Sequence, residues 1–240
     1  MYGWPIALAL LTNHASAGDS NSREDTPLAA EMRHHWFIAT NARNAVVEGD
    51  LARARIWGAE LSQQTPPTTL HRRARPLYAE LQVAALALSR ASDLVEAGKA
   101  MGIVGESCAR CHRFTGGGPR YVGLPVPPQS RPESSDMELH VWGAEMLWLG
   151  LVTDNSQLWQ SAADTLWRSP LTERPAKPRT DLNLAAMEQL THLLPSLADT
   201  EDLSDMATRY GETISTCGLC HIQAEDAGLK PHPTIERDQP

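Results

Sequence analysis

Long apolar runs, strand-like alternation and an excess of positive charge are all missing from this chain of 240 residues. No stretch approaches the roughly 18 to 20 consecutive apolar residues that cross a bilayer, so no membrane span is expected. Apolar and polar residues almost never alternate with a period of two, which argues against a fold built from β-strands. The net charge is −8, and it divides into +2 for residues 1–120 (13 basic, 11 acidic) and −10 for residues 121–240 (8 basic, 18 acidic). Nucleic-acid binding is therefore not expected, whereas an acidic second half suits solubility or the docking of a basic partner.

Cysteine is absent except in two pentapeptides of the form Cys-x-x-Cys-His, which together contain all four cysteines of the chain. This spacing is the attachment signature of c-type haem. Two thiols on one helical turn can each form a thioether with a haem vinyl group, and the adjacent imidazole can reach the iron. The sequence therefore predicts two covalently bound haem c groups. The first motif is Cys108, Cys111 and His112, and the second is Cys217, Cys220 and His221.

Two other uses of these cysteines remain open at this point. Two Cys-x-x-Cys pairs could supply four thiolates to one structural zinc ion. A disulfide within each pair would close only a very small loop and would do little for a chain of this length. A histidine directly after both pairs favours haem over zinc.

The N-terminus, residues 1–17, is similar to a secretory signal peptide. The apolar run Ile6–Leu11 is followed by Ala15–Ala17, a small-x-small cleavage pattern, although no positive charge precedes the run. Haem attachment through thioethers also requires export in bacteria. We therefore expect a periplasmic protein.

Apolar residues at helical spacing predict an all-α fold. The expected domains are haem-binding bundles over 27–114 and 136–225, a Gly/Pro-rich linker over 115–135 and a C-terminal tail over 226–240. Four helices joined by mostly short loops predict a four-helix bundle in each unit, giving two tandem bundles with a haem motif on the last helix of each. The expected helices are 28–48, 50–63, 75–91 and 93–112 in the first unit, and 136–153, 155–168, 181–198 and 201–221 in the second.

The position of the motif at the end of each unit separates this chain from the common small cytochromes c, in which the motif lies near the start. The segment Val104–Phe114, read as Val-Gly-Glu-Ser-Cys-Ala-Arg-Cys-His-Arg-Phe, resembles the end of class II c-type cytochromes, the cytochrome c prime family. The resemblance is looser over Tyr210–His221. It implies a haem pocket inside each bundle, a distal side formed by the first helix, and a dimer as a plausible assembly.

An acid-Met-x-x-His pattern recurs at the start of the first helix of each unit, as Glu31–His35 and Asp136–His140. Imidazole and thioether are the usual sixth ligands of a c-type haem iron. Positions three apart share one helical face, so either the histidine or the methionine could face the iron, though hardly both. The distal candidates are His35 and His140, with Met32 and Met137 as alternatives and an open iron as a third option.

Six-coordinate haems would make the chain a dihaem electron carrier that exchanges electrons with redox partner proteins and turns over no substrate. The alternative is a gas-binding or sensing protein, because cytochrome c prime proteins typically keep an open distal pocket that admits nitric oxide or carbon monoxide. Core packing is the default for the seven tryptophans. Arg110, between the two cysteines of the first motif, and Arg113, directly after that motif, are candidates to pair with haem propionates.

Overall fold

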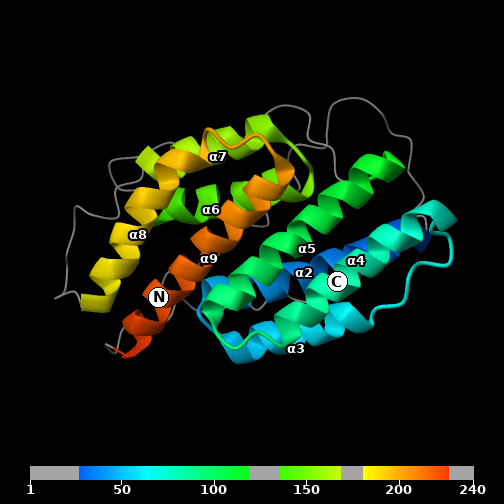
Figure 1. The fold of residues 1–240 in the computed structure, drawn as a ribbon, viewed down its shortest axis with the longest axis horizontal. Helices are drawn as coiled ribbons and strands as arrows, with labels where there is room; N and C mark the ends of the chain where they lie inside the picture. Colours follow the sequence, from blue (N-terminus) through cyan, green and yellow to red (C-terminus); the bar gives the residue numbers. More distant parts are fainter. Residues whose placement is uncertain (1–26, 119–135, 169–180, 227–240) are drawn as a thin grey trace, which may run out of the picture.

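The computed structural model describes residues 27–118, 136–168 and 181–226, and within them it contains helices and no strand. The all-α prediction is therefore confirmed (Figure 1). Each expected helix is present, with ends that differ from the prediction by a few residues. The helices are α2 (Pro27–Val47), α3 (Leu51–Gln63), the short 3₁₀ helix η1 (Arg72–Ala74), α4 (Arg75–Ser89), α5 (Leu94–Thr115), α6 (Asp136–Val152), α7 (Ser156–Arg168), α8 (Asp181–Leu197) and α9 (Leu203–Asp226).

The expected signal peptide, most of the expected linker and almost all of the expected tail lie outside the described residues. Among the helices that are described, none combines the length and the apolar character that a membrane span requires.

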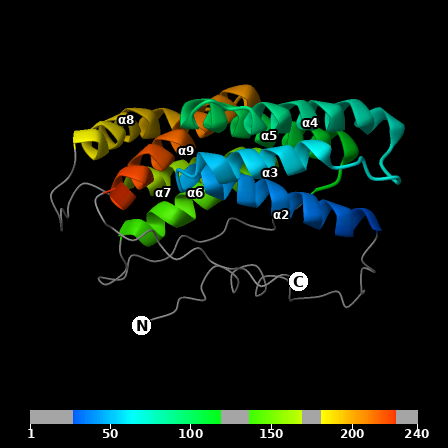
Figure 2. The same cartoon turned by 90° about the horizontal axis from the view of Figure 1, so that it is seen from below.

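Helices α2 to α5 form the first half of the molecule and helices α6 to α9 the second. In the first half α2 contacts α3, α3 contacts α4, α4 contacts α5, and α5 returns to contact α2. The second half repeats this closed cycle through α6, α7, α8 and α9. In Figures 1 and 2 the two halves lie side by side along α5 and α9.

The contact between α5 and α9 joins the halves and is antiparallel. Gly98 of α5 lies against Gly211 of α9, and Gly102 lies against Ala207, so numbers rise along one helix as they fall along the other. A Cβ atom added to Gly98 or Gly102 would clash with a backbone carbonyl oxygen of the facing helix. Glycine is required here because the two backbones touch.

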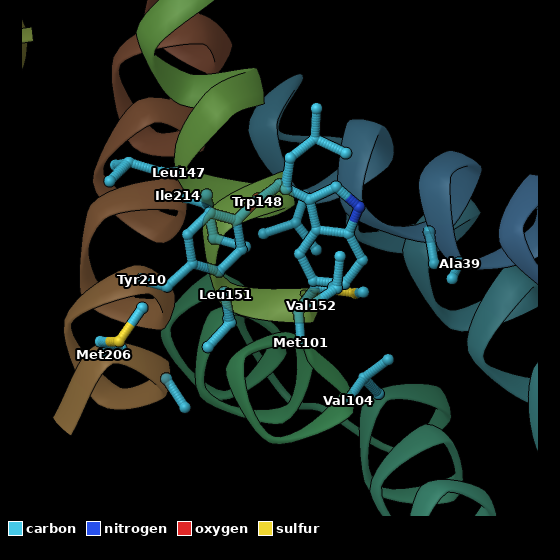
Figure 3. Close-up of a cluster of buried hydrophobic side chains, with 14 of the residues drawn as sticks. Ala39, Met101, Val104, Leu147, Trp148, Leu151, Val152, Met206, Tyr210 and Ile214 are labelled. Atoms are coloured by element: carbon cyan, nitrogen blue, oxygen red, sulfur yellow. The ribbon is translucent and has the colours of Figure 1, made fainter. Parts of the chain in front are cut away.

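A continuous hydrophobic core runs through both halves. At its centre the indole of Trp148 (α6) stacks between Trp36 of α2, at 6.1 Å between ring centroids, and Tyr210 of α9, at 5.5 Å. Figure 3 shows the Tyr210 ring facing Trp148, with Met101 of α5 beside them. Large flat side chains therefore fill the space where helices of the two halves meet.

Candidate functional site

The motif cysteines lie on the last helix of each half, as predicted, and none of the four forms a disulfide. Cys217 is buried, and the other three are partly buried. Burial is the main cause that raises the pKa of Cys108 and of Cys217 to about 12, with a smaller contribution from the second cysteine of each motif. These thiols are therefore protonated at neutral pH, and neither motif is closed by a disulfide.

The antiparallel packing of α5 and α9 places the two motifs at opposite ends of their shared contact, because each motif lies near the C-terminal end of its helix. A single zinc ion would need both cysteine pairs within bonding distance of one point. In the described part of the chain, no group of three or more His, Cys, Asp or Glu side chains is placed to hold a metal ion. The geometry does not support the four-thiolate zinc site.

Both motif histidines hydrogen-bond a backbone carbonyl of the other half. Nδ1 of His112 lies 3.0 Å from the carbonyl oxygen of Val152, and Nδ1 of His221 lies 2.6 Å from that of Val47. A carbonyl oxygen only accepts, so Nδ1 must carry the proton and donate it. In the neutral ring, Nε2 then keeps its lone pair and is the atom that can ligate a metal.

The turn that ends α2 explains why the Val47 carbonyl accepts this bond. Gly49 has φ of +81° and donates its N–H to Val46 O at 3.1 Å, while Asp50 donates to Ala45 O at 2.8 Å. This pair of bonds is a Schellman motif, which satisfies some of the last carbonyls of a helix. The Val47 carbonyl accepts neither of these two bonds, and His221 is its hydrogen-bond partner.

The turn that ends α6 repeats this geometry. Asp154 has φ of +52° and donates its N–H to Leu151 O, and Asn155 donates to Gly150 O, while His112 is bonded to the carbonyl of Val152. Gly49-Asp50 and Asp154-Asn155 therefore occupy equivalent positions in the two turns. In each half, the end of the first helix presents a carbonyl oxygen to the motif histidine of the opposite half.

His140 is placed where a distal ligand of the second haem could lie. Its side chain is buried, its Nδ1 has no hydrogen-bond partner, and it is close enough to His221 for the two rings to interact electrostatically. Burial, with a smaller effect from His221, lowers the pKa of His140 to about 4. The ring is therefore neutral at pH 7, as a metal ligand must be.

His35, the equivalent residue of the first half, has a different environment. Its Nε2 lies 2.9 Å from the hydroxyl of Tyr78, and the two rings meet edge to face at 5.3 Å. Burial, with a smaller effect from His34, lowers the pKa of His35 to about 4, although a hydrogen bond to the Glu31 backbone acts in the opposite direction. A hollow of about 340 Å³ lies beside it, lined by residues of α2 and by the segment Gln64–Thr68. His35 is therefore hydrogen-bonded to Tyr78, whereas His112 is hydrogen-bonded to the backbone carbonyl of Val152.

The other residues expected near the haems are placed as follows. Met32 is partly buried on α2, and Met137 lies on α6 among residues whose side chains are not described. Arg110 and Arg113 form ion pairs with Glu80, at 2.7 Å, and with Asp154, at 2.5 Å, and these pairs are largely exposed. The two arginines are therefore paired within the protein.

Arg43 was not identified from the sequence. Its side chain lies in the core at 5 % exposure, and its Nε has no hydrogen-bond partner, although Nη1 donates to Asn44 at 3.0 Å. Burial raises the pKa of Tyr210 and of Cys217, and the nearby positive charge of Arg43 lowers both in part. The available signal was a single charged residue among the apolar positions of α2 that include Ala39, Ala42 and Val46.

Each motif therefore combines the groups that would hold haem c: two thiols one turn apart that form no disulfide, and an imidazole whose Nδ1 is hydrogen-bonded, so that the lone pair is on Nε2. The second motif adds the buried neutral imidazole of His140, whose Nδ1 has no hydrogen-bond partner, and the buried cation Arg43. Comparison of the chain with protein-family models, with curated proteins and with solved structures gives no match.

Proposed function

We propose that this protein is an exported dihaem c-type cytochrome that carries electrons between redox partners in the periplasm. Cys108 and Cys111 would hold one haem and Cys217 and Cys220 the other. The observation that carries the proposal is the matched pair of bonds from the motif histidines to backbone carbonyls. Ligating histidines commonly donate their second ring N–H in this way, which fixes the tautomer and makes the ligand more basic.

The haem irons, when bound, would supply one-electron exchange without group transfer. The chain itself would orient the proximal imidazoles of His112 and His221 through the carbonyls of Val152 and Val47. Each half would act as a haem-binding unit of four helices, and the two units would form tandem bundles that share the contact between α5 and α9. This arrangement agrees with the resemblance of the first motif to class II cytochromes.

We propose His140 as the sixth ligand of the second haem. It is neutral, buried and close to His221, and its unpartnered Nδ1 leaves a polar atom unsatisfied in the core. Buried polar groups in proteins almost always have a partner, so an orphaned imidazole beside a motif histidine suits ligation of an absent metal.

A second candidate function applies to the first haem. His35 is bonded to Tyr78 and has a hollow beside it, which favours an iron without a histidine on its distal side. Such an iron could bind carbon monoxide or nitric oxide. The chain would then pair one electron-carrying haem with one gas-binding haem.

Visible spectra of the exported, haem-loaded protein test this proposal. Mass spectrometry should show the added mass of two covalently attached haems per chain. The visible spectrum should be low-spin for at least the second haem. Carbon monoxide added to the reduced protein distinguishes the two functions. If both haems are six-coordinate, the spectrum does not change. If only the first iron is open, the absorption bands of one haem of the two shift. A protein that matures without covalent haem would contradict the proposal.

Single substitutions then assign the ligands. His140→Ala should make the second haem sensitive to carbon monoxide, whereas His192→Ala, at an exposed position of α8, should change nothing. If His140→Ala leaves a fully low-spin spectrum, His140 is not the ligand.

A further inference from the structure

We propose that Arg43 is the buried cation of the second haem site, where it binds a haem carboxylate and raises the reduction potential of that haem above that of the first. This inference rests on the proposed function. It concerns a residue of the first half that acts on the haem of the second.

Helix α2 reaches the second motif directly. The carbonyl of Val47 is bonded to His221, and the backbone of α9 at Gly218 lies so close to the carbonyl of Val46 that a Cβ atom would clash with it. Arg43 precedes Val47 by four residues, which is one helical turn, so the two lie on the same face of α2. That face carries both the acceptor for the proximal imidazole and the guanidinium.

The guanidinium lacks an anion. In the part of the chain that the structure describes, no carboxylate lies within ion-pair distance of Arg43, whereas five other arginines make such pairs. Buried charges in proteins are normally paired, because an unpaired charge in a medium of low polarity is unstable. A planar guanidinium whose Nε–H has no partner can donate to a carboxylate, and the two propionates of a haem attached at Cys217 and Cys220 would supply one.

At the position of α6 that corresponds to Arg43, the first motif meets an uncharged residue. The residue four positions before Val152, the carbonyl partner of His112, is Trp148. An uncharged indole therefore takes the place in the first site that a guanidinium takes in the second. Two sites with the same thiols and the same proximal bond would then differ in charge.

This difference predicts an order of reduction potentials. Reduction lowers the positive charge of the iron by one, so a nearby cation favours the reduced form. The second haem should accept an electron before the first, and an electron that enters at the first haem should move to the second.

Potentiometric titration of the full-length, haem-loaded protein tests this inference. The two potentials are first assigned with full-length variants that lack either the Cys108 and Cys111 pair or the Cys217 and Cys220 pair. We then expect Arg43→Met to lower the potential of the second haem by about 59 mV, which is about a tenfold change in the equilibrium constant for one electron. The potential of the first haem should not change. Arg43→Lys, which keeps the charge, should restore most of the difference.

Arg209→Met is the matched control. Arg209 lies on α9, the helix that carries the second motif, but it is 40 % exposed and paired with Glu212, so solvent screens its charge. Its replacement should move neither potential appreciably.

Several outcomes would overturn the inference. A second haem of lower potential than the first in the unmodified protein contradicts it without any variant, which matters if Arg43→Met fails to fold. Equal shifts of both potentials, or no shift of either, also contradict it. A protein with two haems and unmoved potentials refutes the role of Arg43 alone, whereas a protein without haem refutes the proposed function.

Discussion

The hydroxyl group of Tyr78 determines the surroundings of His35. It lies 2.9 Å from His35 Nε2, and it also lies 3.2 Å from the carbonyl of Gln64 and 3.1 Å from that of Thr65. The hydroxyl has one proton to donate and three possible acceptors around it. This cluster ties the start of α2 to the end of α3 and the first turns of α4, and it keeps the imidazole away from solvent.

The low pKa of His35 predicts that the protein loses stability in mild acid. The folded-state pKa is about 4, below the ordinary histidine value of 6.5, so His35 stays neutral in the folded chain at a pH where the unfolded chain becomes protonated. The contribution of His35 to the free energy of unfolding is therefore complete above pH 6.5. It falls as the pH is lowered towards 4, by at most about 3 kcal/mol. Denaturant unfolding of the protein at several pH values measures this loss.

The variant His35→Gln provides the comparison, because glutamine does not titrate. Its stability should change less between pH 6.5 and pH 4 than that of the unmodified protein. Equal slopes in the two proteins would show that His35 does not contribute to the acid sensitivity.

At the level of helices, the close contact between α5 and α9 depends on residues without side chains. Gly98→Ala would gain up to about 1 kcal/mol of helix propensity in isolation. In this contact its Cβ atom would clash with the carbonyl of Gly211, and backbone atoms cannot move aside as a flexible side chain can. We expect a net loss of about 1 to 3 kcal/mol in the free energy of unfolding.

Ile103→Ala is the control for this substitution. Ile103 lies on the same helix but is 49 % exposed, so its truncation should change the free energy of unfolding by less than about 0.5 kcal/mol. If Gly98→Ala were as mild as Ile103→Ala, the two helices would not be in backbone contact.

The helices themselves could be predicted from the sequence because each carries its own signals. Asp50 and Asp93 cap α3 and α5 with side-chain bonds to Arg53 N and Glu96 N, and the periodic apolar residues define the segments between the turns. The partners of the motif histidines could not be predicted in this way. They are backbone carbonyls, identical in every residue, and the chain brings Val47 to His221 across 174 positions.

The side chains around the motifs were harder to place for a similar reason. The repeat of His35 and His140 at one register suggested equivalent roles. Their different surroundings depend on residues without an equivalent in the other half, such as Tyr78. Arg43 was overlooked because the burial of one face of α2 against α9 is a property of long-range packing.

Over the whole molecule, the proximal bonds make each half dependent on the other. A chain that ends at residue 135 would retain the first motif but lose the carbonyl of Val152, and it would expose the faces of α2 and α5 that contact α9. We therefore expect this truncated chain not to exist as a stable folded monomer. Circular dichroism and size-exclusion chromatography measure this, with the full-length chain as the reference.

A truncated chain that is monomeric, helical and cooperative in unfolding would contradict this expectation. It would show that the contact between the halves adds little to the stability of the first.

The reciprocal bonds also give the chain the internal symmetry of a two-fold dimer. Val47 of one half holds the histidine of the other, and Val152 returns the same bond in the opposite direction. A surface that complements its own copy under a two-fold rotation is the defining property of an isologous interface. In a homodimer, one sequence would supply both of these bonds. In this protein the two halves have separate sequences, so each surface can change without the other. The difference between Arg43 and Trp148, at two related positions, is one that the identical chains of a true homodimer cannot have.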